Sequence, residues 1–312
     1  MTGLTGSALD FERDRSYPPA MRHRRAESSP PRRESDERAA ASVASQRNPV
    51  ILRLRKWIAR PERARREGVL VVEGRHAARE ALDRGFQPIL SLASDPMEGD
   101  RRSADLLVVL EARAETSLRV PADLMRRLSS DPSPQGILTV WRRPSFLTSP
   151  SDPIPGRRVL GLWGIQDPGN AGSLLRTAAA FGLETALVLP ETADPFHPKV
   201  VRASAGAAFR MAYASGRTGE SGTDVLGRWR DAGWTLLALD PRGHDRLAPG
   251  EPLPLPPWLL LAGSEGSGLP GEVLSVCARR FRIPMIDGMD SLGVAAAGAV
   301  ALFALCSPDL PQ

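Results

Sequence analysis

Apolar residues recur along this chain in short runs, and most of the later runs end in glycine-rich or polar turns. Short apolar runs bounded by turn residues are typical of buried strands, whereas longer stretches with helical periodicity indicate helices. The C-terminal half predicts strands over 158–164, 185–189, 234–239, 258–262 and 281–284, and helices over 171–181 and 293–305. Such alternation favours an α/β fold with a parallel sheet covered on both faces.

The N-terminal half alternates less strongly. Its patterns predict strands over 69–72, 89–92, 106–110 and 136–140, and helices over 76–84 and 121–128. These elements indicate a small α/β domain over residues 49–142, followed by a Pro/Ser/Thr-rich linker over 143–156 and the larger domain over 157–312. Residues 1–48 contain few apolar residues and are predicted to be a disordered tail.

Composition places the chain among ordinary globular proteins. Charged residues make up 25% and hydrophobic residues 42% of the sequence. The apolar stretch 294–305 is too short to span a bilayer, and the N-terminus has no apolar segment typical of a secretion signal. Only two cysteines occur, without metal-type spacing. A cytosolic, reduced protein without a metal is the simplest interpretation.

Basic residues are concentrated just before the first predicted strand. The formal net charge is +5, and the segment 53–67 alone has seven basic residues against two glutamates. Such a cluster suits the phosphate backbone of a nucleic acid, and a solvated helix face is the alternative. The candidate contacts to a phosphate backbone in this segment are Arg53, Arg55, Lys56 and Arg60.

Three blocks in the C-terminal half place polar residues where predicted strands end, which is where open α/β sheets build binding sites. The first block is 167–172, with Asn170 suited to cap the following helix and Arg176 set away from that helix's apolar face. The second is 263–269, which includes Glu265. The third runs from 281–285 to 290–294.

These blocks contain no Ser-His-Asp, Cys-His or metal-ligand set. They therefore favour a reaction whose electrophile arrives with a cofactor. An alternative is a dinucleotide site, because residues 266–271 match G-x-G-x-x-G and Asp287 follows at a suitable distance. The motif lies late in the chain and Glu265 precedes it, so the match is interpreted as a coincidence of glycines.

Taken in order, the three blocks resemble the motifs of the SpoU/TrmH family of S-adenosylmethionine-dependent RNA 2′-O-ribose methyltransferases, within the SPOUT superfamily. The resemblance covers roughly residues 157–306. The segment before the linker resembles, more weakly, the family's L30e-like substrate-binding domain, through its basic helix and the segments 71–74 and 134–138.

The resemblance implies a deep C-terminal trefoil knot, a homodimer, and S-adenosylmethionine bound in the knot. By motif position it implies catalytic roles for Asn170, Arg176 and Glu265, and contacts from Lys199 and Arg202 to the RNA backbone. The residues implied to bind the cofactor are Leu239, Gly263, Ile283 and Leu292. The extra N-terminal domain favours ribosomal over transfer RNA as the substrate.

The third block departs from the family pattern. Gly293 and Ala295 stand where the family usually has Asn and Ser. A catalytically impaired RNA-binding homologue therefore remains an alternative to an active enzyme. For an active enzyme, the hypothesis is that a ribose 2′-oxygen attacks the sulfonium methyl group in line. Arg176 then holds the adjacent phosphate, since a guanidinium stays protonated.

Overall fold

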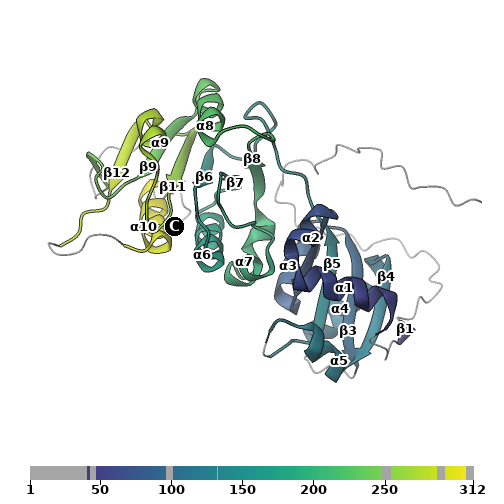
Figure 1. The fold of residues 1–312 in the computed structure, drawn as a ribbon. Coiled ribbons are helices and arrows are strands. Elements are labelled where there is room, and N and C mark those ends of the chain that lie inside the picture. Colours follow the sequence, from purple (N-terminus) through teal and green to yellow (C-terminus); the bar gives the residue numbers. More distant parts are fainter. Residues whose placement is uncertain are drawn as a thin grey trace, which may run out of the picture. The chain divides into compact units, whose positions relative to one another are not determined.

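The computed structural model describes residues 41–42, 47–95, 101–131, 133–247, 254–286 and 292–306. Within these ranges the strands form two separate sheets, one of five strands and one of seven (Figure 1). Each sheet is built from a different half of the chain, as the two alternating patterns predicted. The exact division into domains at residues 143–156 stays a prediction.

The five-stranded sheet has the order β1-β4-β3-β5-β2 and is mixed. Strand β5 runs antiparallel to β2 and β3, whereas β3 pairs in parallel with β4 and β4 with β1. Its strands are β1 (Ala41–Ser42), β2 (Val69–Glu73), β3 (Pro88–Asp95), β4 (Thr116–Pro121) and β5 (Ile137–Arg142). Its helices are α1 (Pro49–Ala59), α2 (Pro61–Arg66), α3 (Arg75–Asp83), α4 (Arg101–Arg113) and α5 (Ala122–Leu128).

The prediction of a strand over 106–110 is wrong, because this segment lies inside helix α4. Leu106, Leu107 and Leu110 are buried while Val108 is 67% exposed. That one-sided spacing is the helical pattern, whereas a strand would bury alternate residues. A short run of apolar residues was mistaken for a buried strand, an ambiguity that periodicity alone does not resolve.

The seven-stranded sheet has the order β10-β12-β9-β11-β6-β7-β8, and all its strand pairs are parallel. Its strands are β6 (Arg158–Leu162), β7 (Thr185–Val188), β8 (Ala212–Ser215), β9 (Thr235–Leu239), β10 (Asp245–Arg246), β11 (Trp258–Ala262) and β12 (Arg279–Arg282). Its helices are α6 (Pro168–Ala180), α7 (Pro198–Ala203), α8 (Gly222–Asp231), α9 (Gly271–Val276) and α10 (Val294–Cys306), with a 3₁₀ turn at Ala207–Arg210.

Helices cover both faces of this parallel sheet, as predicted. Alternate residues of β11 enter different cores: Leu260 joins the cluster formed with α6, α7 and α10, and Leu259 and Leu261 join the cluster formed with α8 and α9. Figure 1 shows α8 and α9 on the opposite side of the sheet from α6, α7 and α10. Burial on both faces explains why the strands are continuous apolar runs.

The Pro/Ser/Thr-rich segment 143–156 is held against the seven-stranded sheet. Leu147 bridges to Ala214 in β8 and exchanges backbone hydrogen bonds with Tyr213 and Ser215. The Phe146 ring stacks on Tyr213 with centroids 5.4 Å apart. The start of this segment therefore extends the β8 edge of the sheet.

Most of the predicted disordered tail lies outside the described residues. Within it, Ala41–Ser42 pairs in parallel with β4, and the Asn48 side chain caps α1 by accepting a hydrogen bond from the Val50 backbone N–H at 2.9 Å. Ordered structure therefore begins before residue 49 at these points.

Candidate active site

Helix α6 begins in the first block, and its capping residue is Asp167. The Asp167 carboxylate accepts a hydrogen bond from the Asn170 backbone N–H at 2.8 Å, and Pro168 takes the first helical position. The prediction that Asn170 caps this helix is therefore wrong. Aspartate followed by proline is the stronger start signal, because proline needs no hydrogen-bond acceptor for its nitrogen. The Asn170 side chain lies inside the first turn and is not used as the cap.

Arg176 lies on the exposed side of α6, as its spacing from the apolar residues predicted. Its neighbours Leu174, Leu175 and Ala178 are fully buried. Within the described residues, Arg176 forms no hydrogen bond or ion pair with Asn170 or Glu265. Its guanidinium is therefore exposed to solvent.

The second block is a tight turn at the end of β11. Ser264 bridges to Gly268, whose backbone N–H donates to the Ser264 carbonyl at 3.0 Å. A Cβ placed on Gly263 would lie 2.5 Å from the Gly268 carbonyl carbon, so only glycine allows this backbone approach. The turn therefore exposes backbone groups and Glu265 at the strand end.

The ends of β9 and β12 lie next to each other in the sheet. Leu239 is the last residue of β9 and pairs with Phe281 of β12, and Ile283 follows β12 by one residue. Both Leu239 and Ile283 are partly buried and pack against the core cluster shared with α6 and α10. They provide apolar walls at this edge of the sheet.

The third block leads into α10 and meets the second block. A Cβ built on Gly293 would lie 3.5 Å from Oε1 of Glu265, which is ordinary van der Waals contact. Further along α10, Gly298 packs against Leu174 of α6, and a Cβ there would lie 2.3 Å from Leu174 Cδ2. Helix α10 thus packs on α6, and Gly293, just before α10, lies beside Glu265.

The parallel sheet brings these segments to one edge. Strands β12, β9, β11 and β6 are consecutive neighbours and point the same way, so Ile283, Leu239 and Gly263 follow adjacent carboxyl ends. The Gly164 Cβ position lies 3.4 Å from Ser264 Cβ, which joins the ends of β6 and β11. This edge combines apolar walls and exposed backbone with the exposed carboxylate of Glu265, and α6, which starts just beyond β6, adds Arg176 and the Asn170 amide.

The basic segment forms α1 and α2, whose buried side chains include Ile51, Leu54 and Trp57. Glu67 accepts hydrogen bonds from Arg63 Nε at 2.8 Å, from Trp57 Nε1 at 3.0 Å and from Arg53 at 3.2 Å. The hydrogen bonds from Arg63, Trp57 and Arg53 lower the pKa of Glu67 to about 2. Arg53 is therefore partly neutralised.

The other three basic candidates on α1 and α2 differ from Arg53 because they are not paired with a carboxylate of the described residues. Arg55, Lys56 and Arg60 are exposed, and no ion pair joins them to another described residue. Their charges are therefore available to a polyanion, in contrast to that of Arg53.

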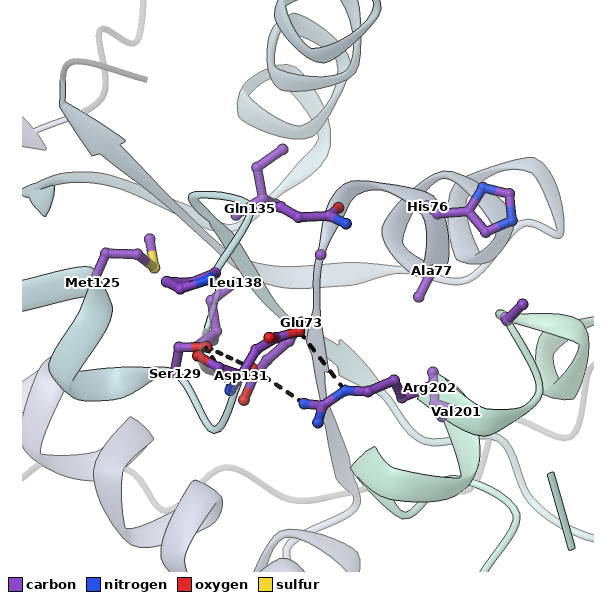
Figure 2. Close-up of a pocket in the computed structure, with 15 residues that line it drawn as sticks. Glu73, His76, Ala77, Met125, Ser129, Asp131, Gln135, Leu138, Val201 and Arg202 are labelled. Atoms are coloured by element: carbon purple, nitrogen blue, oxygen red, sulfur yellow. Dashed lines mark hydrogen bonds and ion pairs between the residues drawn. The ribbon is translucent and has the colours of Figure 1, made fainter. Parts of the chain in front are cut away.

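Lys199 and Arg202 lie on α7 and differ in their surroundings. Lys199 is exposed. Arg202 Nη2 donates to Ser130 Oγ at 3.0 Å and lies 3.5 Å from Oε2 of Glu73. Figure 2 shows this guanidinium directed toward Glu73 and Asp131. All three residues line a cavity of about 210 Å³. None of the four residues expected to bind the cofactor lines that cavity. Contacts from Lys199 and Arg202 to RNA stay a prediction.

Two residues with reactive side chains have structural roles. His197 caps α7 by accepting from the Lys199 backbone N–H at 3.2 Å, and burial lowers its pKa against the opposing effect of Asp194. Burial raises the pKa of the Cys277 thiol to about 12, so it is protonated at neutral pH. Neither residue provides a nucleophile or a base at the strand edge.

The described residues show neither a metal-ligand cluster nor a membrane-spanning helix. No cluster of three or more His, Cys, Asp or Glu side chains is placed to hold a metal ion in that part of the chain. None of the helices described there combines the length and the apolar character needed to cross a membrane.

Sequence reasoning missed a pair of residues beside the site, Asp240 and Arg280. Asp240 follows Leu239 directly and is buried, and its carboxylate accepts a hydrogen bond from Arg280 Nε at 3.0 Å. The position itself was a usable signal, since a carboxylate at the end of a buried strand is the pattern that drew attention to the three blocks.

The alternative of a dinucleotide site does not fit the geometry of residues 266–271. The helix that follows the glycines, Gly271–Val276, has six residues and no side-chain cap, and β11 lies in the middle of the sheet order. Asp287, the proposed ribose ligand, lies outside the described residues.

Comparisons with known proteins agree on one family. Residues 157–303 match the model of the SpoU rRNA Methylase family. An uncharacterised tRNA/rRNA methyltransferase of Synechocystis sp. is 31% identical over 269 residues, which is 84% of this chain and 92% of that protein.

Solved structures of RNA methyltransferases are also similar to this chain. The crystal structure of an AdoMet-bound rRNA methyltransferase from Sinorhizobium meliloti superposes with a TM-score of 0.75 at 25% identity, covering 87% of this chain and 99% of that one. A crystal structure of an RNA 2′-O ribose methyltransferase gives a TM-score of 0.70 at 26% identity, covering 85% and 97%. Sequence and structure are thus similar to these proteins over most of the chain, which belongs to the SpoU/TrmH family of RNA methyltransferases.

Proposed function

We propose that this protein transfers a methyl group from S-adenosylmethionine to a ribose 2′-hydroxyl of structured RNA, with ribosomal RNA as the favoured substrate class. The observation that carries the proposal is the meeting of the β9, β11 and β12 ends with the start of α10 at one edge of a parallel sheet. Two solved relatives support it, one bound to AdoMet and one named as an RNA 2′-O ribose methyltransferase.

The residues at this edge fit an adenosine-containing cofactor. Leu239 and Ile283 are partly buried apolar side chains suited to pack on a purine, and the turn after Gly263 offers backbone donors and acceptors. Leu292, partly buried before α10, completes the set in our proposal. Bound S-adenosylmethionine supplies an electrophilic methyl group, which this chain's own side chains do not provide.

Arg176 is the residue we assign to charge stabilisation. It is exposed on α6, and a guanidinium can form two parallel hydrogen bonds to a phosphate. Held on the phosphate beside the target ribose, it would stabilise negative charge developing on the 2′-oxygen and orient the sugar. Asn170, in the first turn of the same helix, is assigned to orienting the substrate, and Glu265 to orienting Asn170 or nearby backbone amides.

RNA recognition is assigned to the basic helices and to α7. Arg55, Lys56 and Arg60 are exposed cations, and with Arg53, Lys199 and Arg202 they form the proposed contacts to the phosphate backbone. Contacts of this kind position a nucleic acid without reading its sequence. We propose that residues 49–142, which include α1, α2 and most of the five-stranded sheet, form the L30e-like substrate-binding domain.

Assembly and topology complete the proposal. Helix α10 follows β12, packs on α6 and presents Val300 and Phe303 at 42% and 59% exposure. We propose a homodimer that covers these side chains, a trefoil knot that encloses the cofactor, and activity in the cytoplasm. A twofold mass in light scattering, lost in Phe303→Glu, would support the dimer.

A catalytically impaired RNA-binding homologue is the second candidate, and Gly293 is the observation that favours it. The side-chain amide of an asparagine at this position would lie beside Glu265, whereas glycine has no side chain to place there. An impaired homologue would bind RNA in a salt-sensitive manner without transferring methyl groups.

Methyl transfer from radiolabelled S-adenosylmethionine to total rRNA and tRNA separates the candidates. The expected result is labelled rRNA in which the modified linkage resists alkaline hydrolysis, since a 2′-O-methyl group blocks attack by the 2′-oxygen. Arg176→Ala serves as the matched inactive protein. Label in a base, or RNA binding with no label in any RNA, would reject the proposed activity.

A further inference from the structure

A buried carboxylate fixes the turn at the end of β9. The Asp240 backbone N–H donates to the Phe281 carbonyl at 2.9 Å, which extends the β9–β12 pairing by one residue. Its side-chain Oδ1 accepts from the Arg242 backbone N–H at 3.0 Å, and Oδ2 accepts from both Nε and Nη2 of Arg280. One carboxylate thus joins the turn 240–243 to strand β12.

The turn lies directly on the backbone of β12. The Gly243 N–H donates to the Asp240 carbonyl at 2.9 Å and closes the turn. A Cβ on Gly243 would lie 2.2 Å from the Arg280 carbonyl oxygen, so no other residue allows this approach. The turn and β12 are therefore in direct contact beside the strand end.

A second carboxylate–arginine pair lies on the other edge of β12. Asp245, in β10, accepts from Arg279 Nε at 3.0 Å and from the Arg280 backbone N–H at 3.1 Å. The two pairs differ in burial: the Asp240 side chain is 5% exposed, whereas that of Asp245 is 30% exposed. Only the Asp240 pair connects β12 to β9, the strand that ends at Leu239.

Electrostatics favours an ionised pair at Asp240. Burial acts to raise the pKa of Asp240, but hydrogen bonds from Arg280 and the Arg242 backbone outweigh it, and the pKa is lowered. A buried charge of this kind is costly when its partner is removed. Loss of either partner should therefore move the turn or the strand end.

We propose that Asp240 and Arg280 are positioning residues for the cofactor site. They hold the end of β9 against β12, so that Leu239 and Ile283 form the two apolar walls between which the adenosine part of the methyl donor binds. This inference rests on the proposed function, because it assigns the pair to the S-adenosylmethionine site of the same enzyme.

The test is the affinity of the full-length protein for S-adenosylhomocysteine, measured by isothermal titration below the thermal unfolding transition. Asp240→Asn and Arg280→Gln should each weaken binding on the order of tenfold. Arg280→Gln leaves the buried Asp240 carboxylate without its partner, and Asp240→Asn leaves the partly exposed Arg280 guanidinium without its own. The double variant should bind more tightly than either single variant, since an amide pair leaves no unpaired charge. RNA affinity without cofactor should stay within about twofold.

Asp245→Asn is the matched control. It removes an arginine-paired carboxylate from the opposite edge of the same strand and should leave the affinity for S-adenosylhomocysteine within about twofold. Arg280→Lys covers the case in which the other variants fail to fold: it keeps the charge, loses the two-pronged contact, and should raise the KM for S-adenosylmethionine more than it lowers kcat.

The outcomes separate the two proposals. If the wild-type protein does not bind S-adenosylhomocysteine, the proposed function falls and this inference falls with it. If the wild type binds and folded Asp240→Asn or Arg280→Lys binds equally well, only the positioning role is rejected. Equal weakening by Asp245→Asn would also reject it, because the effect would then be general to β12.

Discussion

The five-stranded and seven-stranded sheets use charge in different ways. Near the five-stranded sheet, exposed cations lie on the solvent side of α1 and α2, whose apolar residues pack inward. In the seven-stranded sheet, one charge beside the site, Asp240, is buried and paired with Arg280. Long-range attraction to a polyanion needs only the number and exposure of charges, whereas a small-molecule site needs their exact placement.

The difference suggests that substitutions in the two regions will have different signatures. Changes on α1 and α2 should alter RNA affinity gradually and in a salt-dependent manner. Changes at the edge of the parallel sheet should act on turnover, cofactor affinity or stability, one residue at a time.

Arg176→Ala should have the largest effect. If Arg176 stabilises charge that develops on the substrate, its loss should lower kcat by about 100-fold or more. Arg176→Lys should retain part of the activity, because lysine keeps the charge without the two-pronged geometry. Single-turnover methyl transfer with saturating RNA measures both, and an alanine variant near the wild-type rate would remove Arg176 from the catalytic step.

Two helical glycines in the parallel-sheet region should respond in opposite directions to alanine. A Cβ on Gly172 of α6 would lie 2.5 Å from Ala203 Cβ and 2.8 Å from the Val200 carbonyl oxygen, so Gly172→Ala should destabilise the protein by about 2 kcal/mol. Gly227 of α8 has nothing within 4 Å, and Gly227→Ala should stabilise it by ~0.5–1 kcal/mol. Urea unfolding measures the free energy of unfolding of each variant. If Gly172→Ala were as stable as Gly227→Ala, α6 and α7 would have to move apart freely.

Neutralising three exposed cations of α1 and α2 should weaken RNA binding on the order of tenfold. The triple variant Arg55→Gln, Lys56→Gln, Arg60→Gln should also reduce the slope of log affinity against log salt by roughly 2, as expected for the loss of about three phosphate contacts. Arg53→Gln is the control: Arg53 already pairs with Glu67, so its loss should matter less than that of Arg55. Filter binding at several salt concentrations gives the RNA affinity and the salt slope of each variant. A salt slope that does not change would place the RNA elsewhere.

Gly293→Asn should have the smallest effect, and it distinguishes an active from an impaired enzyme. The Cβ position at residue 293 has room, and an asparagine amide there could donate to Glu265. We expect kcat to rise by about threefold, because an added hydrogen bond contributes roughly 0.5–1.5 kcal/mol. A far larger rise, from an almost inactive wild type, would favour the impaired homologue instead.

Much of the fold could be predicted from the sequence where burial was extreme. Strand β11 was predicted with its observed bounds, and β6, β7, β9 and α10 to within about two residues, because strands buried on both faces are continuous apolar runs. Helix α7 and strand β8 were missed, since both are short and rich in small or charged residues. Helix α4 was misassigned because Leu106–Leu110 is equally compatible with a buried strand.

The sequence by itself determined the family, through three motifs in order, although the third departs from the family pattern at Gly293 and Ala295. It also placed polar residues after β6 and β11, but not the buried carboxylate after β9. Only the tertiary structure decided that Arg53 pairs with Glu67 while Arg55 does not, and that Asp240 is buried and pairs with Arg280. Motifs and helix caps are local, whereas these ion pairs and burial depend on which distant segments meet and exclude water.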